Sequence, residues 1–438
     1  MKSVKLTAVK DGILMTEDVS LCTPEQQALC NRAEGNCKGK NRWRLILTKH
    51  NAQRIYTILQ SLFWLTYGLM FAFAAVYMQH GGFSTSTIGI VLGCSYALSA
   101  ALQPTFAYLF RRLKIDAENV IVIIYINNIL LAAALLTEVL PKAFIGFILI
   151  VMFGMQSALQ PFIDILPRRW SNMGYPVNYG SARGIGSLLY AMMTMGIGYL
   201  LNTISPAILP AFYMVTIGLS LFILFRLRIE IGARSENADL SGTAKGRKLW
   251  RSGMLPLLCG ICCLSFGHVL IDNYMLLIMQ SIGGGSENLG IAIGIASLVE
   301  FPAMLLYSRF SKRFGCYKLL ILSAWAWLTK NILVLFSHTP TVIYAAELLQ
   351  FCSYGIYIPS IVQFIASIYD MDSNIRGQSL AGSAYTAGGV ISTLAGGLML
   401  DAVGVRETLI IVVAITFAGA LLISISVSRF QRSLSHAH

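Results

Sequence analysis

Residues 118–139 read ENVIVIIYINNILLAAALLTEV, and no charged residue lies between Glu118 and Glu138. A helix rises about 1.5 Å per residue, so about 20 apolar residues cross a hydrocarbon layer roughly 30 Å thick. This stretch therefore predicts a membrane-spanning helix, and similar stretches lie on both sides of it.

Twelve such runs occur along the chain, and most of their connections are too short to hold a soluble domain. The runs cover residues 53–79, 86–110, 118–139, 143–166, 179–203, 207–227, 253–280, 287–309, 317–337, 341–368, 378–400 and 405–428. They predict an all-α integral membrane protein with twelve transmembrane helices.

The composition argues against a water-soluble enzyme. Of the 438 residues 56% are hydrophobic and only 12% are charged, whereas a soluble chain carries about 25% charged residues. The mean hydropathy is +0.66. The formal charge of +13 would suggest nucleic acid as a partner of a soluble protein, but here its placement matters more.

Lysine and arginine are distributed unevenly between the two sides of the predicted membrane. Nearly all lie on the side of the two termini, and only Lys142 and Arg406 lie on the other. By the positive-inside rule both termini and the central link are cytoplasmic. We expect a multi-pass protein of the plasma (inner) membrane with no nucleic-acid partner.

A polar link divides the runs six and six. The predicted parts are a cytoplasmic tail (1–50), a six-helix bundle (51–228), a cytoplasmic loop (229–250), a second bundle (251–430) and a short C-terminal tail (431–438). Weak internal repetition supports two pseudo-symmetric bundles, which is a common transporter plan with the site between the halves.

The nine cysteines predict free thiols. Cys22, Cys30 and Cys37 lie in the tail without a CxxC pair, and disulfides are rare in the cytoplasm, so we expect neither disulfides nor a metal site. The chain has no GxxxxGK[ST] phosphate loop, no HExxH pair and no credible nucleophile triad. We therefore expect no enzyme activity and no cofactor, and transport that follows a gradient.

Six charged residues interrupt the apolar runs. They are Asp164, Arg183, Asp272, Glu300, Lys330 and Glu347. Each costs about 2.5–3.5 kcal/mol at a helix centre on insertion scales, so such residues normally face a cavity or each other. They predict a polar transport pathway. For Asp164 and Glu347, which lie near helix ends, a location at the membrane interface is an equal alternative.

Polar and aromatic residues recur at helical spacing beside these charges, so each set shares a helix face. The sets are Gln156, Gln160 and Asp164; Arg183, Ser187, Tyr190 and Thr194; Glu347, Gln350, Tyr354 and Tyr357; and Tyr56, Gln60, Trp64 and Tyr67. Amides and charges beside rings suit a polyhydroxylated or aromatic solute. Aromatic residues also fill helix contacts, which is the alternative for each ring taken singly.

The intramembrane charges do not balance, because four acids face two bases. Asp164 can pair with Arg183, and Lys330 with Asp272 or Glu347. A remaining acid then lacks a partner, and a buried carboxylate without a partner binds a proton. This favours proton coupling, although sodium can fill the same place. The candidates for the coupling proton are Glu300, Glu347, Asp272 and His268, the last of which is equally well explained as a hydrogen-bonded histidine at a helix contact.

Residues 179–187, YGSARGIGS, with Tyr190 after them, resemble the helix-five signature of the major facilitator superfamily. The resemblance is to the lactose permease and the related oligosaccharide and phenylpropionate proton symporters, and it covers nearly everything after residue 50. It implies that Arg183 binds solute hydroxyls and that Tyr190 stacks on a solute ring.

Two further segments carry the same resemblance. Residues 161–164, PFID, are similar to the segment whose acid pairs with that arginine, and residues 299–302, VEFP, to the one whose glutamate contacts sugar. The chain also departs from the family: Ser353 stands where the proton-releasing glutamate is expected, and Ser181 replaces a second arginine. Galactoside specificity is therefore doubtful, and coupling requires other residues.

These observations predict a monomeric secondary active transporter that moves a small polar solute, sugar-like or aromatic acid-like, by alternating access with proton symport. The expected solute ligands are Asp164, Gln160, Arg183, Tyr190, Glu300 and Lys330. The alternatives are an exporter of amphipathic compounds by proton antiport and a membrane sensor that binds solute without moving it.

Overall fold

The computed structural model describes residues 9–10, 13–14, 45–46, 51–113, 115–137, 139–228, 253–369 and 371–435. Contacts divide the chain into one unit of residues 1–47 and 225–230 and another of residues 48–224 and 231–438. In the first unit β1 (Val9–Lys10) pairs antiparallel with β2 (Ile13–Leu14), and β3 (Leu45–Ile46) pairs parallel with β4 (Leu227–Arg228). Most of the predicted tail with its three cysteines, and the predicted loop 229–250, lie outside the described residues.

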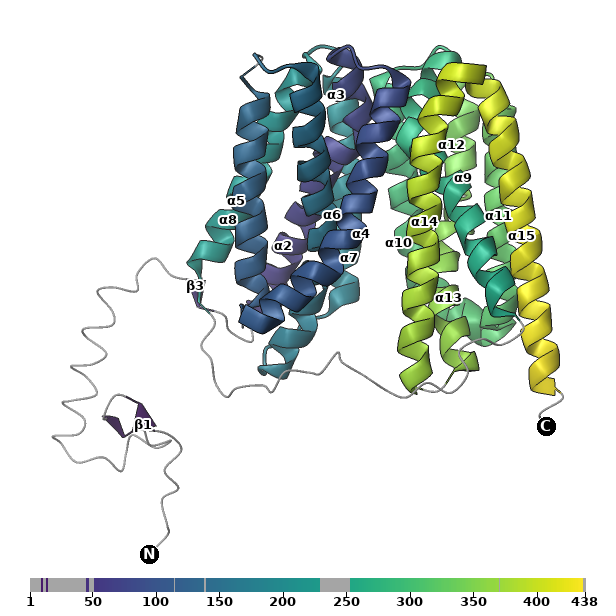
Figure 1. The fold of residues 1–438 in the computed structure, drawn as a ribbon. Helices are drawn as coiled ribbons and strands as arrows, with labels where there is room; N and C mark the ends of the chain where they lie inside the picture. The colour runs from purple at the N-terminus through teal and green to yellow at the C-terminus, as the bar shows by residue number, and fades with distance from the viewer. Residues whose placement is uncertain are drawn as a thin grey trace, which may run out of the picture. The chain divides into compact units, whose positions relative to one another are not determined.

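The described residues of the second unit form helices joined by short loops (Figure 1). Its first half contains α2 (Ala52–Tyr67), the π-helix η2 (Gly68–Ala72), α3 (Ala74–His80), α4 (Thr85–Leu113), α5 (Ala117–Leu135), α6 (Lys142–Asn172), α7 (Tyr179–Leu200), the short η3 (Pro206–Ile208) and α8 (Leu209–Arg226). Its second half contains α9 (Met254–Ser281), α10 (Ser286–Phe314), α11 (Cys316–Leu335), α12 (Pro340–Leu348), α13 (Tyr354–Ile368), α14 (Met371–Val403) and α15 (Val405–Ser435).

The predicted all-α membrane fold is confirmed, and each of the twelve predicted runs coincides with helical structure. Ten helices of the described chain are long and apolar enough to cross a membrane. The two remaining runs fall short for different reasons. Helix α7 carries Arg183 and several glycines and serines, and the run 341–368 is divided into α12 and α13, each too short alone.

Two runs predicted as continuous helices are interrupted. The first changes to π-helix at Gly68–Ala72, where a Cβ on Gly68 would lie 2.6 Å from the ring of Tyr190. The other breaks at residues 349–353, and a Cβ on Gly355 just beyond would lie 2.6 Å from the Cβ of Ala303. Counting apolar residues does not detect such breaks, because the composition stays apolar through them.

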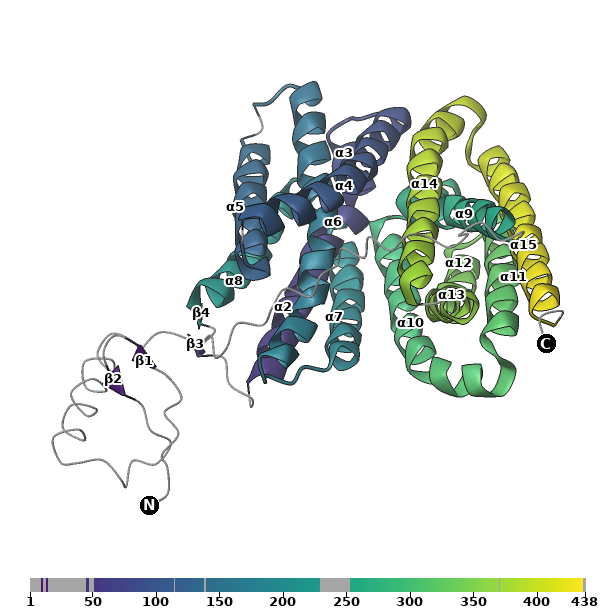
Figure 2. The same cartoon turned by 60° about the horizontal axis from the view of Figure 1, so that its bottom comes forward.

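The two halves form separate groups of helices that meet along α4 with α14 and along α7 with α10 (Figures 1 and 2). We call these two helix contacts the α4–α14 seam and the α7–α10 seam. Glycines allow the helix backbones to touch at both of them. A Cβ on Gly89 would lie 2.8 Å from the carbonyl oxygen of Thr393, and a Cβ on Gly290 would lie 2.3 Å from that of Thr194. Small residues at helix contacts permit this close approach in membranes.

Hydrogen bonds join the halves at one end of the bundle, opposite to Ala52 and Ser435, which we call the distal end. Three pairs of residues form them: Ser86 with Asp401, Gln79 with Gln280, and Asn202 with Glu287. The backbone N–H of Ser86 donates to Asp401 at 2.7 Å, and the two glutamine amides bond reciprocally at 3.0 Å. Together with the glycine contacts they close the distal end in this structure.

Replacing Gly290 with leucine should prevent this closure, because the new Cβ meets backbone atoms that cannot turn aside. The distance between spin labels on the distal residues Ser84 and Ala402, measured by pulsed electron resonance, should lengthen by several ångströms. Gly218→Leu is the matched control, since a Cβ there meets nothing within 4 Å. An unchanged distance distribution in Gly290→Leu would contradict the proposed role of this glycine.

Candidate functional site

Arg183 lies on α7 with its guanidinium over an aromatic ring. Its Cζ is 3.7 Å from the centroid of the Trp64 ring, and its Nη1 donates to the Ser187 hydroxyl at 2.9 Å. A guanidinium over the face of tryptophan is held electrostatically by the ring quadrupole. Arginine has five N–H donors in a fixed fork, so this arrangement orients the group while leaving donors for a ligand.

Aromatic side chains surround this arginine. The rings of Trp64 and Tyr190 meet edge to face at 6.3 Å, Trp64 lies 5.6 Å from Tyr67, and Tyr67 stacks on Phe71 at 4.5 Å. The missing side chain at Gly68 leaves room for Tyr190. The predicted neighbourhood of Arg183 and Tyr190 is therefore present, and Trp64 is the ring in direct contact with the cation.

The expected ion pair between Asp164 and Arg183 is not formed in the described part of the chain. Asp164 lies within electrostatic range of Arg183, but its Oδ1 is buried without a hydrogen-bond partner. The guanidinium is instead engaged by Trp64 and Ser187. Gln160 and Asp164 are half-buried on α6 and remain within reach of the same region.

The predicted polar stripe on α6 is buried to different degrees along its length. Gln156 is 1% exposed and accepts hydrogen bonds from Asn128 and Tyr213, whereas Gln160 and Asp164 are half-buried. Gln156 therefore faces α5 and α8. On α2, likewise, Tyr56 is fully buried and donates to Gln60. These groups belong to helix packing.

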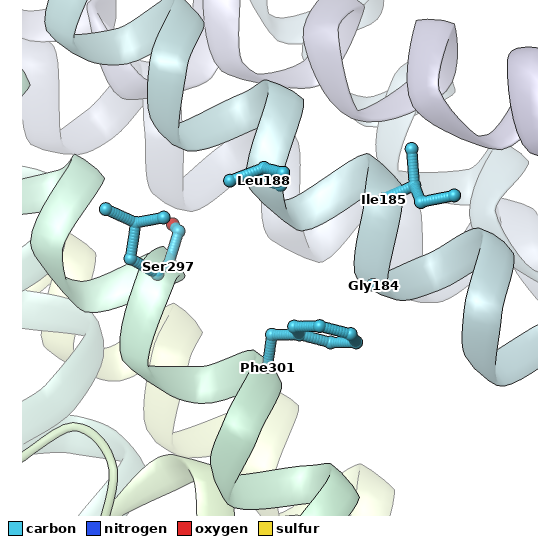
Figure 3. Close-up of a pocket in the computed structure, with 6 residues that line it drawn as sticks. Gly184, Ile185, Leu188, Ser297 and Phe301 are labelled. Carbon is cyan, nitrogen blue, oxygen red and sulfur yellow. The ribbon is translucent and has the colours of Figure 1, made fainter.

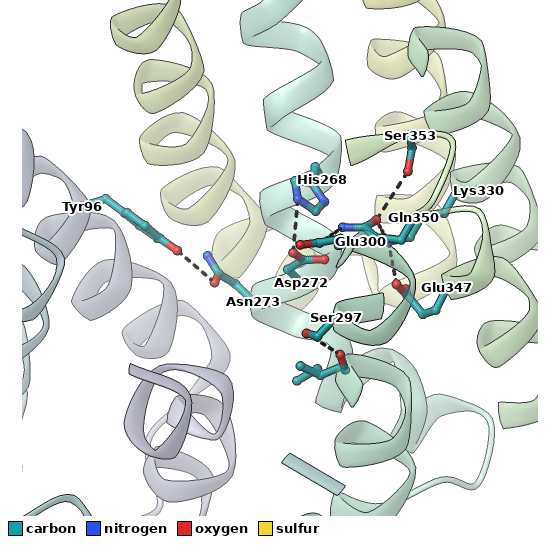
Figure 4. Close-up of polar contacts among 11 residues, drawn as sticks. Tyr96, His268, Asp272, Asn273, Ser297, Glu300, Lys330, Glu347, Gln350 and Ser353 are labelled. Carbon is teal, nitrogen blue, oxygen red and sulfur yellow. Dashed lines mark hydrogen bonds and ion pairs between the residues drawn. The ribbon is translucent and has the colours of Figure 1, made fainter. Parts of the chain in front are cut away.

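A connected polar network lies in the second half (Figure 4). Lys330 is 1% exposed, and its Nζ donates to Glu347 Oε2 at 2.7 Å and to Gln350 Oε1 at 2.8 Å. The other end of that amide, Gln350 Nε2, donates to Glu300 Oε1 at 3.0 Å. Of the two predicted partners of Lys330, the structure selects Glu347 over Asp272.

Glu347 is 2% exposed, so its carboxylate is enclosed by protein and does not reach the surface of the bundle. The break after α12 explains its position. Glu347 and Gln350 lie in the tight turns that end this helix, and both therefore reach Lys330. The carbonyl end of a helix also favours a cation.

Glu300 differs from Glu347 in forming no ion pair within the described chain. Its carboxylate receives the neutral amide of Gln350, while Arg183 and Lys330 act on it only at longer range. Lys330 thus pairs with Glu347, and the half-buried Glu300 has no cation in direct contact, which favours binding of a proton.

His268 and Asp272 lie together on α9, as their spacing predicted. His268 Nε2 is 3.5 Å from Asp272 Oδ2, and the imidazole packs beside both Trp327 and Tyr354, at ring distances of 5.3 and 5.1 Å. His268 Nδ1 is buried without a partner. The contact is present, and a role in proton transfer stays a prediction.

The α7–α10 seam brings the two halves of the site together. A Cβ on Gly184 would lie 1.9 Å from the Phe301 ring, and around them is an apolar cavity of about 90 Å³ that Ser297 also lines (Figure 3). Arg183 and Glu300 adjoin these two residues in sequence. Each therefore lies beside the seam, within electrostatic range of the other.

One polar link between the halves was missed from the sequence. Tyr96 donates to Asn273 Oδ1 at 3.5 Å, and Asn273 Nδ2 donates to Thr393 at 3.0 Å. The available signal was an asparagine beside Asp272 in an otherwise apolar run. The described cysteines are free thiols, and no cluster of three metal-ligating side chains occurs in the described residues.

Known proteins similar to this chain are transporters. A maltose permease of Geobacillus stearothermophilus is 26% identical over 357 residues, which cover 79% of this chain and 87% of the relative. A probable 3-phenylpropionic acid transporter of Escherichia coli (strain K12) is 23% identical over 291 residues, covering 61% and 72%.

Solved structures show the same fold. The crystal structure of the nucleoside transporter NupG superposes with a TM-score of 0.70 at 15% identity, covering 87% of this chain and 99% of that one. A bacterial homologue of the human lysosomal transporter Spinster, inward-facing and unoccupied, gives 0.61 at 12% identity, covering 88% and 98%.

The family model described as MFS_1 like family matches residues 56–411, which is most of the chain and includes every residue of the candidate site. The expected resemblance to major facilitator transporters is thereby confirmed, and these relatives are transporters rather than enzymes. The protein is a membrane transporter and belongs to the MFS_1 like family.

Proposed function

We propose that this transporter moves a small polar solute, sugar-like or aromatic acid-like, by alternating access coupled to proton symport. The observation that carries the proposal is that Arg183, held over Trp64 in one half, and Glu300 in the other half lie beside the same α7–α10 seam within electrostatic range of each other, without forming an ion pair. Charged groups at this spacing suit hydroxyl or carboxylate groups, and the rings suit an apolar solute face. The names of the maltose and 3-phenylpropionic acid relatives support both solute classes.

In this proposal Glu300 serves both the solute and the proton. Its carboxylate has an amide partner, Gln350, and belongs to no ion pair among the described residues. A proton on Glu300 removes a charge that lacks a direct partner from the low-dielectric bundle before the halves move. Glu347 is a weaker candidate in this proposal because its carboxylate is in direct contact with Lys330. Asp272 with His268 is the second candidate for the proton site.

The distal closure supports an inward-facing state. Solute would then enter or leave from the side of Ala52 and Ser435, which the positive-inside rule assigns to the cytoplasm. Rocking of the halves about the glycine seams would expose the same site to the other side.

Arg183→Gln should abolish solute binding. The purified wild-type protein, screened by thermal shift against sugars, nucleosides and aromatic acids, should be stabilised by one class, because a ligand stabilises the folded state that binds it. The variant should lose that shift, whereas the distal control Arg406→Gln should keep it. A shift that persists in Arg183→Gln, or one seen only with lipophilic cations, would favour the exporter alternative.

Glu300→Gln should keep solute exchange across the membrane but abolish its coupling to the proton gradient. Proteoliposomes with the variant should retain solute counterflow, because the amide keeps the side chain's shape and one acceptor oxygen for Gln350 and resembles the protonated acid, but a proton gradient should no longer drive accumulation. Wild-type vesicles provide the reference in both assays. Normal gradient-driven accumulation by the variant would exclude Glu300 as the coupling residue and leave the pair of Asp272 and His268.

Lys330→Met should destabilise the fold by about 3–5 kcal/mol, because it leaves Glu347 buried and unpaired. The double variant Lys330→Met with Glu347→Gln should recover most of that loss, since the stranded charge is gone. Denaturant unfolding in detergent measures both. Equal destabilisation of the single and double variants would show that the pair contributes through packing rather than charge.

A further inference from the structure

A cleft lies at the distal end of the first half, and none of its lining residues belongs to the candidate site. The starts of α4 and α6 and the loop of residues 81–84 enclose about 510 Å³. Its lining includes Ser84, Thr87, Ile90, Lys142, Phe147 and Ile150. The cleft is polar at the helix starts and apolar deeper along both helices.

A lysine is fixed at the polar end. Lys142 Nζ donates to the Gly82 carbonyl oxygen at 2.7 Å, which uses one of its three N–H donors. Gly82 has φ +70°, and a Cβ there would lie 2.9 Å from Nζ, so glycine makes this approach possible. Within the described chain no carboxylate forms an ion pair with Lys142. The ammonium therefore presents positive charge at the mouth of the cleft.

The apolar end is exposed where the protein faces lipid. Ile90 is 47% exposed and Phe147 60% exposed, on helices that are long and apolar enough to cross the membrane. At about 1.5 Å per residue, Phe147 and Ile150 lie roughly 7 and 12 Å deeper than Lys142. The cleft thus combines a cationic end at membrane-surface depth with an apolar groove along the acyl region.

We propose that this cleft binds an anionic phospholipid of the distal leaflet, with its phosphate at Lys142 and an acyl chain along Ile90 and Phe147. Charge complementarity selects an anionic over a zwitterionic headgroup. The cleft adjoins the closed distal end, because Ser84 and Thr87 flank Ser86, whose backbone and hydroxyl bond to Asp401.

The test is native mass spectrometry of the full chain, delipidated and then supplied with equal amounts of phosphatidylglycerol and phosphatidylcholine. The wild type should retain phosphatidylglycerol preferentially. Lys142→Gln should lower that preference about fivefold, the factor that corresponds to roughly 1 kcal/mol per basic residue at an anionic surface. Arg406→Gln, which removes the other distal base, should leave it unchanged.

A second pair of variants tests the groove. Phe147→Ala should reduce retention of both lipids, whereas Phe144→Ala, 56% exposed on the same helix outside the cleft, should not. Equal retention of the two lipids by the wild type would overturn the proposal. So would an equal loss of the preference for phosphatidylglycerol in Lys142→Gln and Arg406→Gln. If inorganic phosphate alone bound the protein as tightly as phosphatidylglycerol does, and Lys142→Gln weakened both equally, the site would bind a soluble anion and the proposal would also fail.

Discussion

The buried contact between Lys330 and Glu347 constrains the whole second half. An ammonium that is 1% exposed within a membrane bundle requires an opposing charge and further acceptors, because its desolvation penalty is large. Glu347 supplies the charge and Gln350 the acceptor, and both come from the turns that end α12. The same glutamine uses its opposite end on Glu300, so the ion pair also fixes where the unpaired acid lies.

The residues that hold the second half together thus differ from those proposed to contact the solute. The paired charges cancel locally and can remain in place while the halves move, whereas Glu300 and Arg183 approach the seam from different halves. A ligand bridging them would experience any rocking motion directly. In the proposed mechanism this division would let the groups that contact solute move while the charges that hold the second half together stay paired.

Much of the fold was accessible from the sequence, because runs such as 118–139 report helix length and membrane crossing directly. The pairing of His268 with Asp272 followed from one turn of helical spacing. Other features depend on contacts between runs, which no single run contains. The helix break at 349–353 lies inside a run that is apolar overall. Arg183 contacts Trp64 rather than pairing with Asp164, and Gln156 bonds to Asn128 of a neighbouring helix.

The hydrogen bonds at the distal end also set an energy scale. Exposed hydrogen bonds contribute about 0.5–1.5 kcal/mol each, and bonds to a charged group about 1.5–3 kcal/mol; the contact of Gln79 with Gln280 is of the first kind and that of Ser86 with Asp401 of the second. Apart from the helix packing at the glycines, these hydrogen bonds therefore contribute only a few kcal/mol. A ligand shifts the balance between two states only by its difference in affinity for them, and a tenfold difference is worth about 1.4 kcal/mol. In the proposed transport cycle, a solute that binds one orientation only moderately more tightly would thus offset one of these bonds.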